Sequence, residues 1–153
     1  MAPTTEPWVD ARPFRAHLRH LMAVGDLTAA EVADLAGLSP RLATSLLHGR
    51  NGRPVRRISS ASASALLTVT AQQTRTLRSA QVPSAVSRRR LERLLEQGTS
   101  PAVLAAQLGV TTLALLDLAE PSTRWCSALL ALRLAIAERG RHGVDDCDLE
   151  AAA

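Results

Sequence analysis

The sharpest pattern of apolar and polar positions lies in residues 28–49, TAAEVADLAGLSPRLATSLLHG, where apolar residues recur at helical spacing. Thr28 can cap a first helix and form a capping box with Glu31. Gly37 suits the left-handed conformation that ends a helix, and Ser39 can cap the next one. The pattern therefore predicts a helix, a tight turn and a second helix.

The predicted helix pair is apolar on one side and polar on the other. Its inward positions form one stripe of small and aliphatic residues, namely Val32, Ala33, Ala36, Ala43 and Leu46. The outward positions of its second helix are all polar, namely Ser39, Arg41, Thr44, Ser45 and His48. Such a pair is typical of a helix-turn-helix, whose second helix hydrogen-bonds base edges in the major groove. Small bundles that bind nothing contain the same pair, so this stretch alone leaves both interpretations open.

A helix before this pair and a basic turn after it complete a first unit. The earlier helix is expected to begin near Asp10 or Pro13. Residues 50–57 hold four arginines in eight positions, and the Asn-Gly pair among them favours a tight turn. We expect a short basic hairpin or an ordered loop there, followed by a closing helix that Ser59 or Ser60 caps.

The chain then repeats this unit. Residues 18–49 resemble residues 91–121, and the turn residues match, Ala33/Gly37/Leu38/Ser39 with Ala105/Gly109/Val110/Thr111. Farther along, Ser-Ala-Leu-Leu at 64–67 recurs at 127–130. Ser87 is expected to cap the first helix of the second copy and to place three arginines in its first turn. Positive charge opposes the helix dipole there, which makes sense if phosphates lie nearby.

These patterns predict an all-α fold built from tandem helix-turn-helix units of three or four helices. The content of aromatic and β-branched residues is low, and alanine and leucine dominate, which favours helices over sheets. We expect five parts in chain order, which are a flexible arm (1–9), an N-terminal helix-turn-helix domain (10–69), a connector (70–86), a second helix-turn-helix-like domain (87–139) and an acidic tail (140–153).

The outward residues of the second copy differ in chemistry from those of the first. The five positions that carry Ser39, Arg41, Thr44, Ser45 and His48 in the first copy carry Thr111, Leu113, Leu116, Asp117 and Glu120 in this one. Acids repel phosphate, and leucine can contact only the thymine methyl group, so we expect no base reading by this copy. Two alternatives stay open for its leucines. They could form a protein-contact face, or Trp125 and the last helix could cover them.

Charge is concentrated in the middle of the chain. All eighteen basic residues are arginine, and the formal net charge is +4. Residues 41–93 hold eleven arginines against one acid, Glu92, a charge of +10, whereas residues 1–40 carry −2 and residues 94–153 carry −4. A GC-rich coding sequence would explain the choice of arginine but not the clustering. A basic middle of this kind attracts polyanions, of which DNA is the commonest for a helical domain.

Several other classes of function lack a signal in the sequence. Cys126 and Cys147 have no spacing typical of a zinc site or a disulfide framework. The four histidines lack a neighbouring carboxylate cluster, and no phosphate-binding glycine loop or nucleophile–base pair occurs, so we expect neither an enzyme nor a cofactor. With no signal peptide and no membrane-spanning apolar run, we expect a cytoplasmic protein that associates with the nucleoid through DNA.

One known group of proteins shares these features. The run GLSPRLATSLLHGRNGRPVRRIS, then a capped LLTVT helix, a connector and a basic VSRRRLERLL helix, resembles actinobacterial and actinobacteriophage helix-turn-helix proteins. It is similar to mycobacteriophage immunity repressors, which pair an N-terminal helix-turn-helix with a second DNA-contacting domain. The resemblance covers residues 13–138 and implies sequence-specific binding of duplex DNA, and repression. The leucines and acids of the second recognition helix depart from it.

We therefore expect a sequence-specific DNA-binding regulator, and a repressor because no separate activation or sensor domain fits this length. The outward residues of the first recognition helix would read bases. The residues expected on the DNA backbone are Arg50, Arg53, Arg56, Arg57, Ser87, Arg88, Arg89, Arg90 and Arg93. The alternative is a helical adaptor that binds protein through Leu113 and Leu116. Whether the chain acts as a monomer, as a homodimer or with another protein bound to its second domain stays open.

Overall fold

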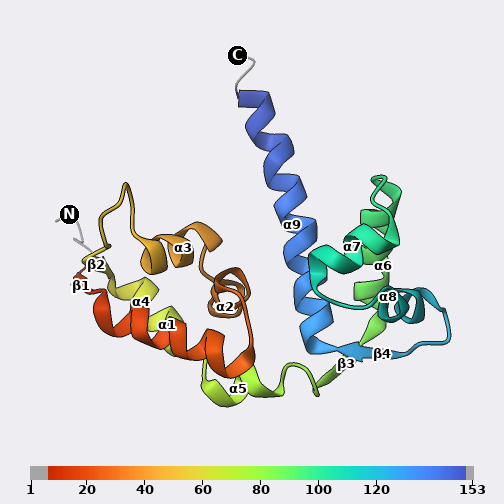
Figure 1. Ribbon diagram of the computed structural model, residues 1–153, viewed down its shortest axis with the longest axis horizontal. Helices are drawn as coiled ribbons and strands as arrows, with labels where there is room; N and C mark the ends of the chain where they lie inside the picture. Colours follow the sequence, from red (N-terminus) through yellow and green to blue (C-terminus); the bar gives the residue numbers. More distant parts are fainter. Residues whose placement is uncertain (1–6, 151–153) are drawn as a thin grey trace, which may run out of the picture. The chain divides into compact units, whose positions relative to one another are not determined.

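The computed structural model divides the chain into two compact units, unit 1 (residues 1–76) and unit 2 (residues 77–153) (Figure 1). It describes the backbone of residues 7–150 and the side chains of residues 7–141. The expectation of a mostly helical fold is confirmed. Two small sheets of two strands each were not foreseen.

The described residues show the same order of elements in both units, except that unit 1 has an additional helix at its end. The elements of unit 1 are β1 (Trp8–Asp10), α1 (Arg12–Gly25), α2 (Ala29–Ala36), α3 (Pro40–His48), β2 (Arg57–Ser59), α4 (Ser60–Leu67) and α5 (Ala71–Thr76). Those of unit 2 are β3 (Gln81–Pro83), α6 (Ser84–Glu96), α7 (Pro101–Leu108), α8 (Thr112–Ala119), β4 (Trp125–Ser127) and α9 (Ala128–Glu150).

In each unit, a two-stranded antiparallel sheet pairs the strand at the beginning of the unit with the strand that follows the third helix. In unit 1 the central pair of the register is Val9 with Ile58, and in unit 2 it is Val82 with Cys126. The prediction of a flexible arm over residues 1–9 is therefore wrong for residues 8 and 9, because β1 hydrogen-bonds to β2. Residues 1–6 of that expected arm lie outside the described residues.

The local signals of the α2–α3 pair are confirmed. Thr28 and Glu31 form the predicted capping box at the start of α2. Gly37 adopts the left-handed conformation (φ 69°), and the Ser39 hydroxyl accepts a hydrogen bond from the Leu42 amide at the start of α3. In unit 2, Gly109 (φ 63°) ends α7 in the same way.

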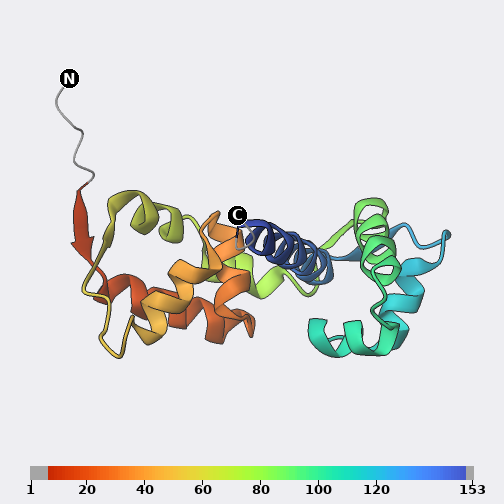
Figure 2. The same ribbon diagram turned by 90° about the horizontal axis from the view of Figure 1, so that it is seen from above.

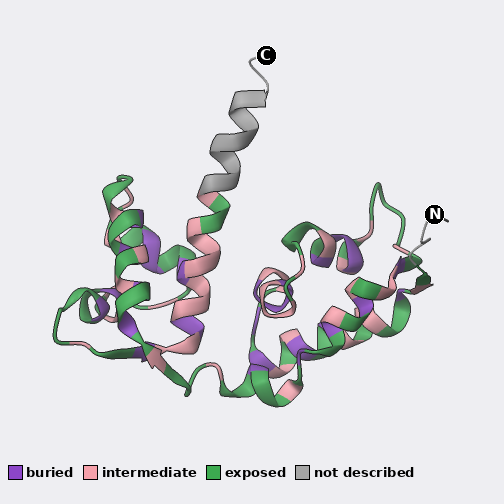
Figure 3. Ribbon diagram, turned by 180° about the vertical axis from the view of Figure 1, so that it is seen from behind, coloured by how far each residue is buried: buried purple, intermediate pink, exposed green. Residues whose placement is uncertain are grey.

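Each unit packs its helices around its own aliphatic core (Figure 3). The largest buried apolar residues of unit 1 include Leu18, Leu21, Val32, Leu46, Ile58, Leu66 and Val69. The core of unit 2 contains Leu91, Leu94, Leu104, Ala105, Leu108, Leu115, Leu118, Cys126, Leu130 and Leu134. No single described helix is long and apolar enough to cross a membrane, and α7 with α8 reaches the required hydropathy only as a pair bent by 113°.

Three other expectations about organisation need correction. The expected connector over 70–86 contains α5, which packs on α1, together with β3 and the beginning of α6. The helix expected to begin after Ser87 begins at Ser84. The segment from 140, expected to be an acidic tail, continues α9 to Glu150, and its side chains after residue 141 lie outside the described residues.

The alignment of the last helices in the two copies also needs correction. Ser127 caps α9 by accepting a hydrogen bond from the Leu130 amide (3.2 Å), as Ser59 caps α4 by accepting one from the Ser62 amide (3.1 Å). Ser127 therefore corresponds to Ser59, 68 positions earlier, and not to Ser64, which lies inside α4. Because the preceding helices match at an offset of 72, the second copy is four residues shorter between the start of its third helix and its second strand.

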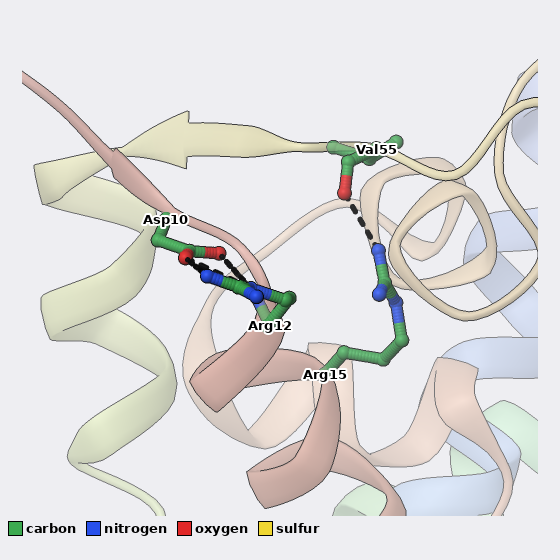
Figure 4. A network of polar contacts seen from close by, with 4 residues as sticks. All are labelled: Asp10, Arg12, Arg15 and Val55. Carbon is green, nitrogen blue, oxygen red and sulfur yellow. Dashed lines mark hydrogen bonds and ion pairs between the residues drawn. The ribbon is translucent and has the colours of Figure 1, made fainter.

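One partly buried interaction occurs at the same place in both units. In unit 1 the Arg15 guanidinium donates to the carbonyls of Leu46 and Val55, each at 2.6 Å; Figure 4 shows the bond to Val55. In unit 2 the Arg88 guanidinium donates to the carbonyls at 118, 120 and 123. Each arginine, which we call the clamp arginine of its unit, thus binds the carboxyl end of the third helix and the segment leading to the second strand. Positive charge at a helix carboxyl end is also favourable to the helix dipole.

Replacing the Arg88 clamp with methionine should lower the free energy of unfolding of unit 2 by about 2–3 kcal/mol. The reason is that partly buried carbonyls lose a charged donor while the side-chain stem is retained. Urea unfolding can be followed by Trp125 fluorescence in a Trp8→Phe background, in which only unit 2 contains a tryptophan.

The matched control is Arg89→Met, because Arg89 lies next to the clamp in the same helix and is exposed. Its effect should stay within about 0.5 kcal/mol. Equal effects of the two substitutions would show that the clamp hydrogen bonds do not stabilise unit 2.

Candidate functional site

The outward face of α3 presents most of the side chains expected to read bases. Arg41, Thr44 and His48 are exposed and follow one another at spacings of three and four, so they lie on one face of the helix. Ser39 is exposed at the start of α3, where its hydroxyl accepts the capping hydrogen bond. The Thr44 hydroxyl donates to the Pro40 carbonyl (3.0 Å), which leaves its oxygen able to accept another hydrogen bond.

Ser45 does not belong to this exposed face, so the expectation that it reads bases is wrong. Its side chain is buried, with 8% of the residue exposed. The Ser45 hydroxyl accepts a hydrogen bond from the Arg50 guanidinium (3.3 Å), and its carbonyl accepts one from the Gly49 amide (2.8 Å). Ser45 therefore connects the end of α3 to the following turn, because its position on the helix faces that turn.

The basic segment after α3 forms the predicted tight hairpin. The Arg50 amide donates to the Arg53 carbonyl (2.8 Å), and the Arg53 amide donates to the Arg50 carbonyl (3.0 Å). The two residues between them, Asn51 and Gly52, have φ values of 50° and 74°, as a type I′ turn requires. Figures 1 and 2 show this loop projecting from the helices of unit 1, and Figure 3 shows it as largely exposed.

The four arginines of this segment are all exposed, but they differ in what holds them. The guanidinium of Arg50 donates to Ser45, and that of Arg57 donates to the Trp8 carbonyl (3.0 Å). Among the described residues, the guanidinium groups of Arg53 and Arg56 have no hydrogen bond or ion pair. The site therefore combines two positioned cations with two that are available to an anion.

A hollow of about 510 Å³ lies between the beginning of α1 and residues 54–57. An ion pair at its edge joins Asp10 to Arg12, whose guanidinium approaches the carboxylate to 2.6 Å (Figure 4). The hydrogen bonds from the Arg12 side chain and amide, together with the positive charge, lower the pKa of Asp10 to about 2. Asp10 therefore stays ionised at neutral pH and offsets the charge of Arg12. The other cations of the hollow are Arg15, which donates to backbone carbonyls, and Arg56 and Arg57, which no acid pairs.

Most of the unit 2 side chains that were expected to contact phosphate make contacts within the protein instead. Ser87 is buried within α6, and Arg88 is the clamp arginine, so the expectation that both bind DNA is wrong. Arg90 and Arg93 both pair with Glu138 of α9, at 3.1 and 2.9 Å. Within the described part of the chain, Arg89 is exposed and has no such partner.

The α8 helix presents an apolar and acidic face to solvent. Leu113 and Leu116 are 65% and 52% exposed, and Asp117 and Glu120 are exposed beside them. Trp125 is itself 58% exposed. The interpretation in which Trp125 and the last helix cover these leucines is therefore wrong, and the interpretation as a contact face stays a hypothesis.

Arg15 is a residue of the site that the sequence analysis did not identify. It is half-buried and fixes the end of α3 relative to the residue before the basic strand. A signal was present in the sequence. Arg15 and Arg88 occupy matching positions of two copies whose other outward residues diverge, which indicates a role common to both units.

The described residues contain no group of three or more histidine, cysteine or acidic side chains that could hold a metal ion. Cys126 lies in the core of unit 2. The side chain of Cys147 lies outside the described residues.

No protein-family model matches the chain, and neither a curated protein nor a solved structure matches it significantly.

Gly49→Ala should disrupt the basic hairpin. Gly49 has φ 82° and ψ −174°, a region that only glycine adopts readily, and an added Cβ would lie 2.2 Å from the Arg53 carbonyl oxygen. Gly52→Ala is the control, since its φ is also positive (74°) but nothing lies within 4 Å of an added Cβ. The control should cost about 1–2 kcal/mol, and Gly49→Ala at least about 1 kcal/mol more.

The free energy of unfolding of unit 1 provides the measurement. It can be followed by Trp8 fluorescence in a Trp125→Phe background. If Gly49→Ala is no more destabilising than Gly52→Ala, the close approach of the hairpin to Gly49 is not a constraint.

Proposed function

We propose that this chain is a sequence-specific duplex-DNA-binding regulator built from tandem helix-turn-helix units. In this proposal unit 1 reads the major groove with α3, and the following basic segment binds phosphates. Arg41, Thr44 and His48 would contact base edges, while Arg50, Arg53, Arg56 and Arg57 would contact the backbone. Ser39 would lie beside the groove, with its hydroxyl capping α3.

The observation that carries the proposal is the combination of an exposed polar helix face with unpaired arginines next to it. Arg41 on α3 and Arg53 and Arg56 after it are exposed, and no described acid pairs with them. Guanidinium groups on exposed surfaces suit bidentate contacts with guanine and phosphate oxygens. A helix followed by a projecting basic hairpin provides both kinds of contact from one continuous segment.

The proposal assigns unequal roles to the two units. The α8 positions that correspond to Arg41, Thr44 and His48 are Leu113, Leu116 and Glu120, which do not suit a groove of negative potential. Unit 2 would therefore contribute at most phosphate contacts through Arg89, with Arg90 and Arg93 weakened by their pairing with Glu138.

The proposed regulatory role and cellular place come from the resemblance to known repressors. We propose repression because of the resemblance to actinobacterial and mycobacteriophage repressors. A protein of this kind would act in the cytoplasm, on the nucleoid.

A protein adaptor is the second candidate function. The observation in its favour is the exposure of Leu113 and Leu116 on one face of α8. In that case the arginines of unit 1 would serve an acidic protein partner instead of DNA.

Arg41→Ala should reduce specific binding by about 1–3 kcal/mol and relax the sequence preference, because it removes a base contact. Arg56→Ala should instead weaken binding to all sequences similarly and lower the salt slope by about one unit, because it removes a phosphate contact. Fluorescence anisotropy on a selected duplex and on its scrambled form would separate these effects.

Arg75→Ala is the control for total charge, because Arg75 is exposed on α5, outside the proposed interface. It should change neither affinity nor preference by more than a small factor. An unchanged sequence preference in Arg41→Ala would refute the assignment of α3 as the reading helix.

Salt dependence separates the regulator from the adaptor. If the four arginines at 50–57 neutralise phosphates, the logarithm of the affinity for random duplex DNA should fall with the logarithm of salt concentration at a slope on the order of −3 to −4. Titrations at several salt concentrations measure this slope. Absent or nearly salt-independent binding would favour the adaptor.

A further inference from the structure

A second hollow on unit 1 combines an apolar wall with a basic rim. Its volume is about 350 Å³, and it lies on the side of the basic segment that faces β1 and α4. The apolar lining includes Trp8, Leu42 and Ile58, and the arginines that line it are Arg50, Arg53 and Arg57. Trp8 is 54% exposed, so much of its apolar surface is open to solvent. Such a surface fits a ligand that is apolar in its centre and acidic at its edge.

The face of α8 in unit 2 has that opposite chemistry. Leu113, Leu116, Asp117 and Glu120 follow each other at spacings of three, one and three residues, so they form one stripe along the helix. More than half of each leucine is exposed. The two carboxylates lie toward the carboxyl end of the stripe, so the leucines can enter an apolar hollow while the acids reach its rim.

We propose that α8 of a second copy of this chain docks in the hollow of unit 1. In this arrangement the leucines of one copy contact Trp8 and Leu42 of the other, and Asp117 and Glu120 pair with Arg50 and Arg53. This self-association stands independently of DNA binding, because it requires only surfaces of the protein.

Charge decides which surfaces of two copies can meet. If the α8 faces of two copies met, carboxylates would lie against carboxylates, and if two basic hairpins met, guanidinium groups would lie against guanidinium groups. Like charges in direct opposition disfavour association strongly. The pairing of unit 1 with unit 2 of another copy is the arrangement that brings opposite charges and apolar surfaces together.

This pairing would also oppose DNA binding. Arg50 and Arg53 belong both to the hollow and to the proposed phosphate contacts, so one ligand would exclude the other. Each copy has one hollow and one α8 face, so the contact is heterologous, and it can close reciprocally between two copies or extend to more. DNA would then dissociate the assembly, and a high protein concentration would weaken DNA binding.

Sedimentation velocity of the full chain without DNA tests the proposal. The wild-type protein should associate as its concentration rises from micromolar to millimolar, and more strongly at low salt. The double variants Asp117→Arg/Glu120→Arg and Arg50→Glu/Arg53→Glu should each raise the dissociation constant by at least about tenfold. Arg75→Glu is the control: it reverses one charge at a position outside both surfaces, so it should leave association unchanged.

A mixture of the two double variants provides a second test, which does not depend on how the reversed charges affect the solubility of each variant. Each variant retains the surface that the other has lost, so an equimolar mixture of folded proteins should associate again. Circular dichroism verifies that both variants are folded. The proposal is overturned if the wild-type protein sediments as a monomer throughout the concentration range, or if the folded variants fail to associate with each other. Wild-type association that both double variants retain would equally overturn it.

Discussion

The hydrogen bonds of the two clamp arginines determine where each unit can place the segment after its third helix. A helix ends with carbonyls that have no partner within the helix, and a loop beside it adds more. Arg15 satisfies one carbonyl of each kind in unit 1, and Arg88 satisfies one helix-end carbonyl and two loop carbonyls in unit 2. In unit 1 this interaction fixes the chain on both sides of the basic hairpin. The orientation of the hairpin relative to α3 therefore depends on a side chain that itself belongs to α1.

The sequence allowed good prediction where the signal is local. Capping residues, left-handed glycines and the Asn-Gly turn act within a few positions, and the helix pair and the hairpin are confirmed. The short strands were missed because three residues such as Trp8–Asp10 carry no recognisable alternation and depend on a partner about fifty residues away. Arg88 was misassigned because its sequence environment, a run of three arginines, does not distinguish the one that turns inward. Ser45 was misassigned because a small polar residue at the edge of a helix face can bond to its own turn.

The two units share an order of elements and differ in the chemistry of their surfaces. The sheet register, the serine caps and the clamp recur at matching positions. These interactions are internal, so they constrain both copies alike. The outward positions of α3 and α8 carry no such constraint, and they are polar and basic in unit 1 and apolar and acidic in unit 2. The proposed reading of DNA by unit 1 and the proposed docking of α8 both rest on this divergence.

Selection of bound sequences from a randomised duplex library, carried out with the full chain, tests the central claim most directly. If unit 1 reads bases through α3, repeated rounds should enrich one short motif, and the enriched duplexes should bind more tightly than the starting pool at the same salt concentration. A single asymmetric motif would indicate one reading unit per site, and an inverted repeat would indicate two copies on the DNA. Enrichment of no motif, with uniform affinity for all duplexes, would contradict the account.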